Sequence, residues 1–507
     1  MTNEERTPGR VAALATGLVA GAAGLGAAQL AAAFVRPQSA PLIALGGAGI
    51  DRTPEWLKHW AIRQFGTHDK QVLLGSMLVG AGIVAALLGL LARTRPRLAG
   101  ALLGALAVAG AAAALTRPDA GPVDALPVLL GAVAAAGVVA VLLPAAARGT
   151  SGDRRSFLAL AGGAAALAAG STLLGRSIAG RKSVAKARAA TRLPAPARPA
   201  PPLPRAADLR IPGLTPFTTP NRDFYRVDTA LVVPQVDPAD WTLRIHGLVD
   251  RPLEITFDEL LRRPLLETDV TLTCVSNEVG GEYAGNARWV GASLAELLRE
   301  ARVRSGADQV FSRSSDGFTV STPLDALMDG RDALLAVAMN GAPLPVEHGF
   351  PARMVVPGLY GYVSATKWVV DLKVSRFTDD RAYWTERGWA DHGTVRTMAR
   401  IDLPRPSADV KAGRIAVAGV AWAQHRGITA VQVRVDGGPW RTAQLAPVPN
   451  TDTWRQWVLE WDAVPGRHRI EARAVDGTGA VQTGNRADPF PSGATGWHQT
   501  TVTVHRN

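Results

Sequence analysis

The stretch ETDVTLTCVSNEVGGEYAGNARWVG, residues 267–291, decides the fold of the soluble part of this 507-residue chain. Val270, Leu272 and Cys274 alternate with Thr271 and Thr273, which is the period of a β-strand with one face in a core. Glycine and asparagine residues are frequent in the next positions and predict a loop directly after Cys274. The sequence therefore places its single cysteine at the end of a strand, where a side chain can reach into a cleft.

The regions around this stretch predict two soluble domains. Within residues 213–395, β-rich runs such as residues 241–246 occur together with helical runs such as residues 293–302, which predicts a mixed α+β domain. Residues 396–507 instead show short alternating runs separated by turn signals such as Asp436-Gly437-Gly438. This pattern predicts a C-terminal β-sandwich, and it contains no catalytic constellation.

The single cysteine restricts the chemistry of the chain. No intrachain disulfide can form, because there is no second thiol. A thiolate is a soft ligand for a transition metal, but a structural zinc site needs about four protein ligands. If Cys274 binds a metal, most of the coordination must come from another source, such as a sulfur-bearing cofactor. The alternative is that Cys274 is an inert, small apolar side chain.

Residues 1–180 predict a transmembrane helical region. A hydrocarbon core of ~30 Å needs ~20 apolar residues to cross it, and five stretches rich in Ala, Gly and Leu meet or approach this length. They are residues 11–35, 72–92, 98–115, 123–147 and 157–178. Small residues allow neighbouring helices in lipid to approach closely, which predicts a compact bundle. No histidine lies in these spans, so we expect a membrane anchor without haem.

The charges of the chain indicate a membrane. Residues 1–205 carry 22 Lys and Arg against 8 Asp and Glu, a net charge of +14, whereas residues 206–507 carry 33 against 35, a net charge of −2. Because the basic excess lies beside apolar spans, we expect the lipid bilayer and not nucleic acid as its partner. Residues 181–212, which are basic and rich in proline, are predicted to be a semi-rigid linker.

Arg154 and Arg155 directly precede the fifth span, and with Phe157-Leu158 they resemble a twin-arginine export signal. Paired arginines also occur simply as cytoplasmic flanks of membrane helices. If the pair is cytoplasmic, the domains that follow the fifth span lie outside. We therefore expect a multi-pass protein of the cytoplasmic membrane with its soluble domains on the extracytoplasmic side.

Four blocks carry a resemblance to a known family. They are Cys274-Val-Ser-Asn277, ARWVGASLAELL at 287–298, LLAVAMNGAPLPVEHGFPARMVVPG at 334–358, and Lys367-Trp368. In order and spacing they resemble the sulfite oxidase family of molybdopterin-dependent oxidoreductases, from Thr215 onward. The resemblance implies an enzyme in which Cys274 ligates molybdenum and the pterin dithiolene and oxo groups complete the coordination. It also implies that the β-sandwich is an immunoglobulin-like dimerisation domain, so a homodimer is possible.

The same resemblance implies a cofactor-binding set. Its members are Asn221, Phe224, Tyr225, Arg226, Cys274, His348, Arg353, Ser364, Thr366 and Lys367. The first four match the segment that lies against the pterin in bacterial relatives. His348, Arg353 and Lys367 match positions that hold the pterin and its phosphate, and cationic groups suit a phosphate. The two hydroxyls are expected near that phosphate.

Two positions depart from the family pattern. Sulfite oxidases follow the cysteine with an arginine-bearing CxGNR stretch, where this chain has Glu278, and they place a tyrosine over the metal, where it has Phe318. Losing a cation and a phenol and gaining a carboxylate should weaken the binding of a dianion such as sulfite. We therefore expect a small neutral or weakly charged substrate, such as an S-oxide, an N-oxide or another oxo acceptor. The catalytic residues are expected to be Cys274, Glu278, Phe318 and Arg226.

Two other functions stay open at this point. The chain could be a sulfite dehydrogenase despite these substitutions, or a non-catalytic anchored binding protein on the same scaffold. The spans contain no haem ligands, and no cysteine cluster is available for iron and sulfur. An enzyme would therefore exchange electrons with a separate carrier, such as a cytochrome or a quinone-linked protein.

Overall fold

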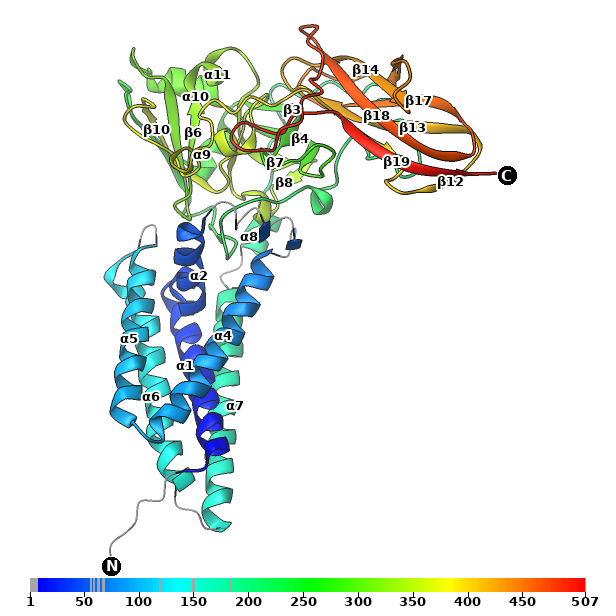
Figure 1. Ribbon diagram of the computed structural model, residues 1–507. Helices are drawn as coiled ribbons and strands as arrows, with labels where there is room; N and C mark the ends of the chain where they lie inside the picture. Colours follow the sequence, from blue (N-terminus) through cyan, green and yellow to red (C-terminus); the bar gives the residue numbers. More distant parts are fainter. Residues whose placement is uncertain are drawn as a thin grey trace, which may run out of the picture. The chain divides into compact units, whose positions relative to one another are not determined.

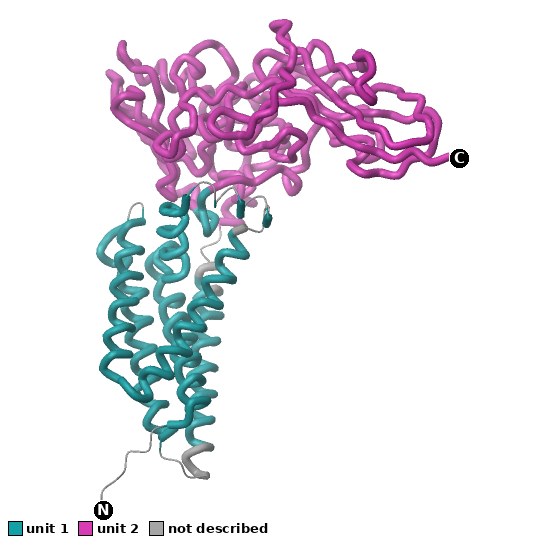
Figure 2. Tube along the Cα trace, viewed as in Figure 1, with its two compact units in different colours: residues 1–183, 229–235 teal, residues 184–228, 236–507 magenta. Residues whose placement is uncertain are grey.

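The computed structural model describes residues 8–54, 57, 60–61, 64–65, 69–117, 120–147, 151–181 and 184–506. The chain divides into two compact units, which are Met1–Ser183 with Thr229–Gln235 (unit 1) and Val184–Asp228 with Val236–Asn507 (unit 2) (Figures 1 and 2). The side chain of Arg154 lies outside the described residues, so the export signal stays a prediction.

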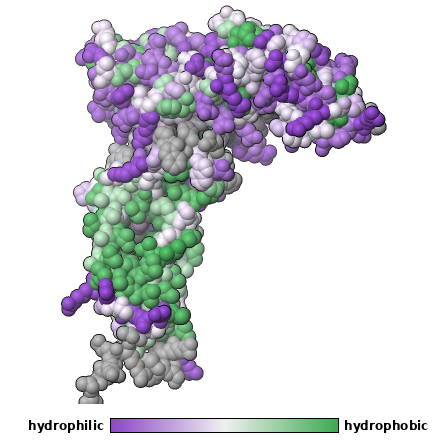
Figure 3. Space-filling view, in the orientation of Figure 1, coloured by the Kyte–Doolittle hydropathy of each residue, from purple (hydrophilic) through white to green (hydrophobic). Residues whose placement is uncertain are grey.

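Among its described residues, unit 1 contains five helices that are long and apolar enough to cross a bilayer, as predicted. They are α1 (Arg10–Phe34), α4 (Asp69–Ala92), α5 (Pro96–Leu115), α6 (Leu126–Ala147) and α7 (Ser151–Arg181), joined by the shorter α2 (Pro41–Arg52). Apolar residues cover the visible face of these helices (Figure 3). Side chains such as Val79 and Leu167 are 65% and 73% exposed, which suits contact with lipid.

Helix α1 is the centre of the bundle, because it packs against α4, α6 and α7. Glycines make this close packing possible. A Cβ at Gly17 would overlap the carbonyl oxygen of Ala85, and one at Gly89 would overlap that of Ala13. The backbones of α1 and α4 are therefore in direct contact.

The first part of unit 2 holds two sheets and short helices. One sheet has the order β2-β1-β10-β5-β6 and the other β3-β4-β7-β8, with β9 also paired to β7. The first comprises β1 (Thr242–Gly247), β2 (Leu253–Thr256), β5 (Gln309–Ser314), β6 (Thr319–Pro323) and β10 (Val369–Ser375). The second comprises β3 (Leu265–Thr273), β4 (Ala284–Ser293), β7 (Leu334–Met339), β8 (Ala342–Pro343) and β9 (Arg353–Val355). The helices are α8 (Ala185–Ala190), α9 (Phe257–Arg262), α10 (Leu294–Ala301) and α11 (Leu324–Met328).

The C-terminal part of unit 2 is formed by two further sheets, of orders β11-β13-β17-β16 and β12-β19-β18-β14-β15. Their strands are β11 (Met398–Leu403), β12 (Asp409–Lys411), β13 (Gly413–Trp422), β14 (Ile428–Val435), β15 (Arg441–Thr442), β16 (Gln444–Leu445), β17 (Arg455–Ala463), β18 (Gly466–Asp476) and β19 (His498–His505). Val417 and Trp457 of one sheet share a core with Val431 and Ile470 of the other, which makes the pair a sandwich. The boundaries predicted at residues 212 and 395 stay predictions.

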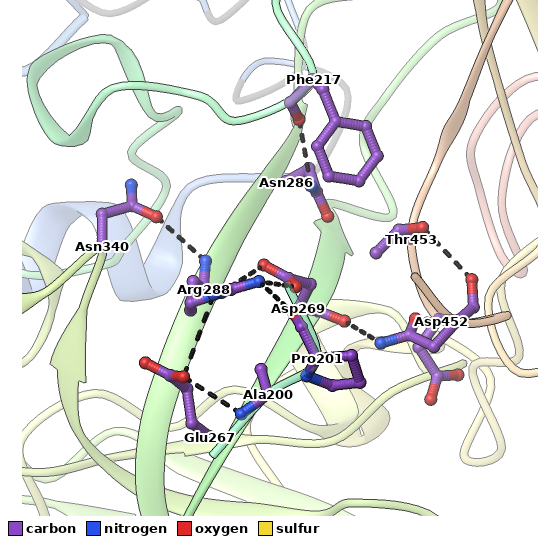
Figure 4. Close-up of polar contacts among 11 residues, drawn as sticks. Ala200, Pro201, Phe217, Glu267, Asp269, Asn286, Arg288, Asn340, Asp452 and Thr453 are labelled. Atoms are coloured by element: carbon purple, nitrogen blue, oxygen red, sulfur yellow. Dashed lines mark hydrogen bonds and ion pairs between the residues drawn. The ribbon is translucent and has the colours of Figure 1, made fainter. Parts of the chain in front are cut away.

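The proline-rich segment, called the strap here (residues 184–212), belongs to unit 2 and is docked on it, which differs from a free spacer. The amide of Arg198 donates to the carbonyl of Leu265 at 3.2 Å, and the amide of Glu267 donates to the carbonyl of Arg198 at 2.9 Å. Figure 4 shows Ala200 and Pro201 of the strap beside β3 and β4. An extended proline-rich chain suits such an edge, since it needs few donors of its own and shields the exposed strand.

Candidate functional site

Cys274 directly follows β3 and opens a tight loop. Its amide donates to the carbonyl of Tyr283 at 2.9 Å, and its own carbonyl accepts from the amide of Asn277 at 3.1 Å. The Oδ1 atom of Asn277 in turn accepts from the amide of Tyr283 at 2.8 Å. One asparagine side chain thus ties the end of the loop to its start. Cys274 is held on this frame with only 9% of its surface exposed.

Burial raises the pKa of the Cys274 thiol, and hydrogen bonds from Ser276 oppose the rise only in part. A protonated, buried thiol is a poor nucleophile. A bound metal would remove the proton, because coordination deprotonates a thiol. The part of the chain that the structure describes has no cluster of three or more His, Cys, Asp or Glu that could hold a metal. Further ligands for a metal at Cys274 would therefore come with a cofactor.

An aromatic group lies close to this thiol. The ring of Phe224 stacks on that of Tyr225 at 5.2 Å between centroids, and it meets Trp289 and His348 edge to face at 5.8 and 5.6 Å. Burial raises the pKa of Tyr225 far above its usual value, with a further increase from Cys274 and an opposing effect of Arg353. Tyr225 is therefore near both the thiol and the guanidinium, two of the predicted site groups.

Arg353 is a buried cation without a carboxylate partner. It begins β9, is 5% exposed, and donates to the main-chain carbonyls of Met354, His348 and Ala365 at 3.3, 3.2 and 3.4 Å. Within residues 184–506, no Asp or Glu lies at ion-pair distance from it. Burial lowers its pKa to about 10, so the group is still charged at neutral pH. A buried, uncompensated guanidinium is costly unless an anion binds beside it.

His348 lies beside Arg353 as a neutral imidazole. It is 3% exposed, and its Nε2 donates to the carbonyl of Asn221 at 3.2 Å. That carbonyl can only accept, so the proton is on Nε2. Burial lowers the pKa of His348 to about 3, and the charges of Arg353 and Lys367 contribute to the shift.

Lys367 and Arg226 share one carboxylate, that of Asp228. The Oδ2 atom of Asp228 lies 2.8 Å from Lys367 Nζ and 2.8 Å from Arg226 Nε, and its side chain is 5% exposed. Burial lowers the pKa of Lys367 to about 8, although Asp228 opposes the shift. Arg226 therefore forms a group of cations with Arg353 and Lys367, called the cation group here. Its net charge is positive, because Asp228 compensates only one of the three.

The two predicted phosphate hydroxyls are engaged within the protein. Ser364 Oγ donates to the carbonyls of Leu359 and Tyr360 at 3.2 and 2.9 Å. Thr366 Oγ1 shares a 2.7 Å hydrogen bond with Ser312 Oγ. Their contacts with a phosphate stay predictions.

Among the described residues, no hydrogen bond joins the side chain of Glu278 to the Cys274 thiol, and the ring contact of Phe318 is with Tyr383. Glu278 is exposed, and among residues 184–506 its carboxylate has no hydrogen-bond partner. The half-buried ring of Phe318 lies against Tyr383, with 5.5 Å between centroids. The catalytic roles expected for these two residues are therefore still predictions.

Comparison with known proteins gives the family. A family model described as an oxidoreductase molybdopterin binding domain matches residues 230–384. Sulfite oxidase of Gallus gallus is 30% identical over 317 residues, 52% of this chain and 68% of the relative. The mitochondrial sulfite oxidase of Mus musculus is 31% identical over 316 residues, and the match spans only 57% of its length. The sulfane dehydrogenase SoxCD from Paracoccus pantotrophus has a similar solved structure, with a TM-score of 0.50, 26% identity, and coverage of 58% of this chain and 84% of that one.

The chain belongs to the sulfite oxidase family. This sulfite oxidase family member is thus a molybdopterin-dependent oxidoreductase, as its four sequence blocks predicted. Its residues also fit the cofactor on physical grounds. Arg353 lacks an anion that the phosphate would supply, and the lone thiol of Cys274 suits a metal whose other ligands arrive with the pterin.

Three neighbours of this family site were not predicted. Asp228 stands two residues after Arg226, and nothing in the sequence shows that its carboxylate also reaches Lys367. Trp289 lies under the Arg353 guanidinium at 5.1 Å, although its place in the ARWVG block was a usable signal. Burial raises the pKa of Tyr360 to about 12, with a smaller effect of Cys274, and its hydroxyl accepts from the amide of Arg396 at 3.2 Å.

Proposed function

We propose that this protein is a membrane-anchored oxygen-atom-transfer enzyme for a small neutral or weakly charged substrate, such as an S-oxide or an N-oxide. The observation that supports this choice is the charge of the loop that follows Cys274. Glu278 stands there with an exposed carboxylate, where the family pattern has an arginine. A carboxylate in place of a cation disfavours the binding of a dianion such as sulfite.

The residues of the site would bind the cofactor at two ends, the metal and the phosphate. When bound, molybdopterin supplies a metal that changes oxidation state by two units as an oxygen atom moves to or from the substrate. Cys274 would hold the metal, and Asn277 fixes the loop that carries the thiol. Arg353 and Lys367 would bind the phosphate, since both are buried cations. Neutral His348, which is held by its bond to the carbonyl of Asn221, would orient the pterin without adding charge.

Steady-state assays of the purified full chain with artificial electron donors and acceptors test the substrate class. We expect turnover with S-oxides or N-oxides and weak activity with sulfite. Sulfite oxidation at a kcat/KM of ~10⁴ M⁻¹s⁻¹ or more would contradict the proposal. The Cys274→Ala chain should lose all turnover yet unfold at nearly the wild-type temperature, because the truncation costs only about 1 kcal/mol. Full activity in that variant would remove Cys274 from the mechanism.

A sulfite dehydrogenase is the second candidate, and one observation favours it. The matched sulfite oxidases are 30–31% identical over more than 300 residues, and the matching family model covers residues 230–384, which contain Cys274, Arg353 and Lys367. The same assay decides between the two, since only the dehydrogenase would prefer sulfite over neutral oxo compounds.

The proposed setting is the cytoplasmic membrane. The five apolar helices would anchor the chain, the catalytic unit would face outward, and a separate carrier such as a cytochrome would exchange electrons with it. The β-sandwich is proposed to be immunoglobulin-like and to support a homodimer. Light scattering of the solubilised chain tests the dimer, and a mass of one chain would contradict it.

A further inference from the structure

The edge of β3 that faces away from β4 is completed by the C-terminal sandwich. Asn450 Nδ2 donates to the carbonyl of Asp269 at 3.0 Å. Further along the strand, the amide of Thr271 donates to the carbonyl of Asp452 at 3.0 Å. The carbonyl of Thr271 accepts from Gln424 Nε2 at 2.9 Å. Residues more than 150 positions away thus form hydrogen bonds with the last part of β3, the strand that leads to Cys274.

Gln424 makes the contact nearest to the thiol. It follows β13 by two residues, is fully buried, and also donates from Nε2 to Thr273 Oγ1 at 2.9 Å. The orientation of its amide is fixed, because the carbonyl of Thr271 can only accept a hydrogen bond. Thr273 directly precedes Cys274. A single amide group therefore bonds the strand at two residues of the same edge, the second of which is covalently joined to the thiol residue.

We propose that Gln424 is a positioning residue for the metal ligand, so that the C-terminal sandwich forms part of the metal site. The inference rests on the proposed role of Cys274. A ligand is only as well placed as the strand that carries it, and groups behind a ligand commonly change activity by ~10–100-fold. Gln424 donates two hydrogen bonds on one edge of β3, and β4 pairs with the other edge. Together these contacts fix the direction in which Cys274 leaves the strand.

The test compares Gln424→Met with a matched control, Gln456→Met, in the full, cofactor-loaded chain. Gln456 is also a fully buried glutamine of the sandwich, and it also donates to a main-chain carbonyl, that of Thr215 at 2.7 Å. Its contacts hold residues 208–215 and not β3. Both substitutions keep the side-chain length and remove the amide, so they differ mainly in which segment they release.

We expect Gln424→Met to shift the electron paramagnetic resonance signal and the reduction potential of the molybdenum, and to lower kcat by ~10–100-fold. Gln456→Met should lower the unfolding temperature and leave the signal, the potential and kcat at wild-type values. Equal signals in both variants and the wild type, or equal changes in both variants, would overturn the inference. If Gln424→Met does not fold, Thr273→Val removes one of the two bonds and should shift the signal in the same direction by less; an unchanged signal there also overturns it.

Cys274→Ala in the same spectroscopic series separates this inference from the proposed function. A molybdenum signal unchanged by Cys274→Ala would defeat the ligand role itself. A signal that Cys274→Ala changes and Gln424→Met does not would defeat only the positioning role.

Discussion

At the scale of single residues, the site combines groups that would be unfavourable without a ligand. Arg353 is charged, buried and bonded only to main-chain carbonyls, while His348 next to it is kept neutral with its pKa lowered to about 3. Burying a cation without an anion lowers stability, and polar groups held in this way mark binding sites. The arrangement is that of a protein whose stability rises when the anionic cofactor binds.

Replacing the Arg353 guanidinium should release the cofactor. A charge-assisted bond contributes about 1.5–3 kcal/mol, so Arg353→Met should weaken cofactor binding by ~10–100-fold. Pterin fluorescence and molybdenum content after prolonged dialysis measure the loss. Arg188→Met is the matched control, because Arg188 also donates to two carbonyls, those of Leu344 and Pro343 at 2.7 Å each. Equal retention by both variants would show that Arg353 does not hold the cofactor.

The sequence predicts these residues on different grounds. The place of Cys274 at the end of a strand follows from alternation, because a period of two depends on neighbouring positions alone, whereas its role as a metal ligand comes from the family blocks. The same blocks predict Arg353, His348 and Lys367. Asp228 was missed, since its bonds to Arg226 and Lys367 depend on how two loops meet in the folded chain. The family pattern predicts Phe318 over the metal and Glu278 in the loop after Cys274, whereas the ring of Phe318 lies against Tyr383 and the side chain of Glu278 is exposed, so their catalytic roles stay predictions.

At the scale of elements, the sequence predicts the length of the membrane-spanning helices but not how the helices and the strap pack. The five spans were correctly located, since the thickness of a bilayer fixes how many apolar residues a helix needs. The central place of α1 could not be deduced, because these helices are apolar on all sides and give no periodic signal. The prolines of the strap predict a semi-rigid spacer. Its docking depends on the unpaired edge of β3, which only the sheet order reveals.

The backbone contact between α1 and α4 makes a specific prediction. Gly17→Ile should separate the two helices, because even its Cβ would overlap the carbonyl oxygen of Ala85. Overpacking of this kind costs about 1–3 kcal/mol or more. Gly100→Ile in α5 is the control, since no atom lies within 4 Å of a Cβ at that position. Thermal unfolding of the detergent-solubilised chain should show a lower midpoint for Gly17→Ile only, and similar midpoints for both variants would argue against this packing.

At the scale of the whole molecule, the charge asymmetry and the family site suggest one arrangement. The basic excess lies in residues 1–205, whereas residues 206–507 are nearly neutral. Cytoplasmic flanks of membrane helices carry such excess. Export of the soluble domains by a twin-arginine route stays a prediction, and it depends on Arg154 and Arg155 before the fifth span.

Arg154 and Arg155 allow this route to be tested apart from simple charge effects. Changing both to lysine keeps every positive charge, so a cytoplasmic flank would still work, whereas a twin-arginine signal would fail. We expect a C-terminal tag after Asn507 to be cleaved by protease added to spheroplasts of the wild type, and to be protected in the double lysine variant. Arg93→Lys with Arg95→Lys is the control, because these arginines also flank spans and should behave as wild type. Cleavage in the Arg154 and Arg155 variant would reduce the pair to a flank, and protection in the wild type would place the catalytic unit in the cytoplasm.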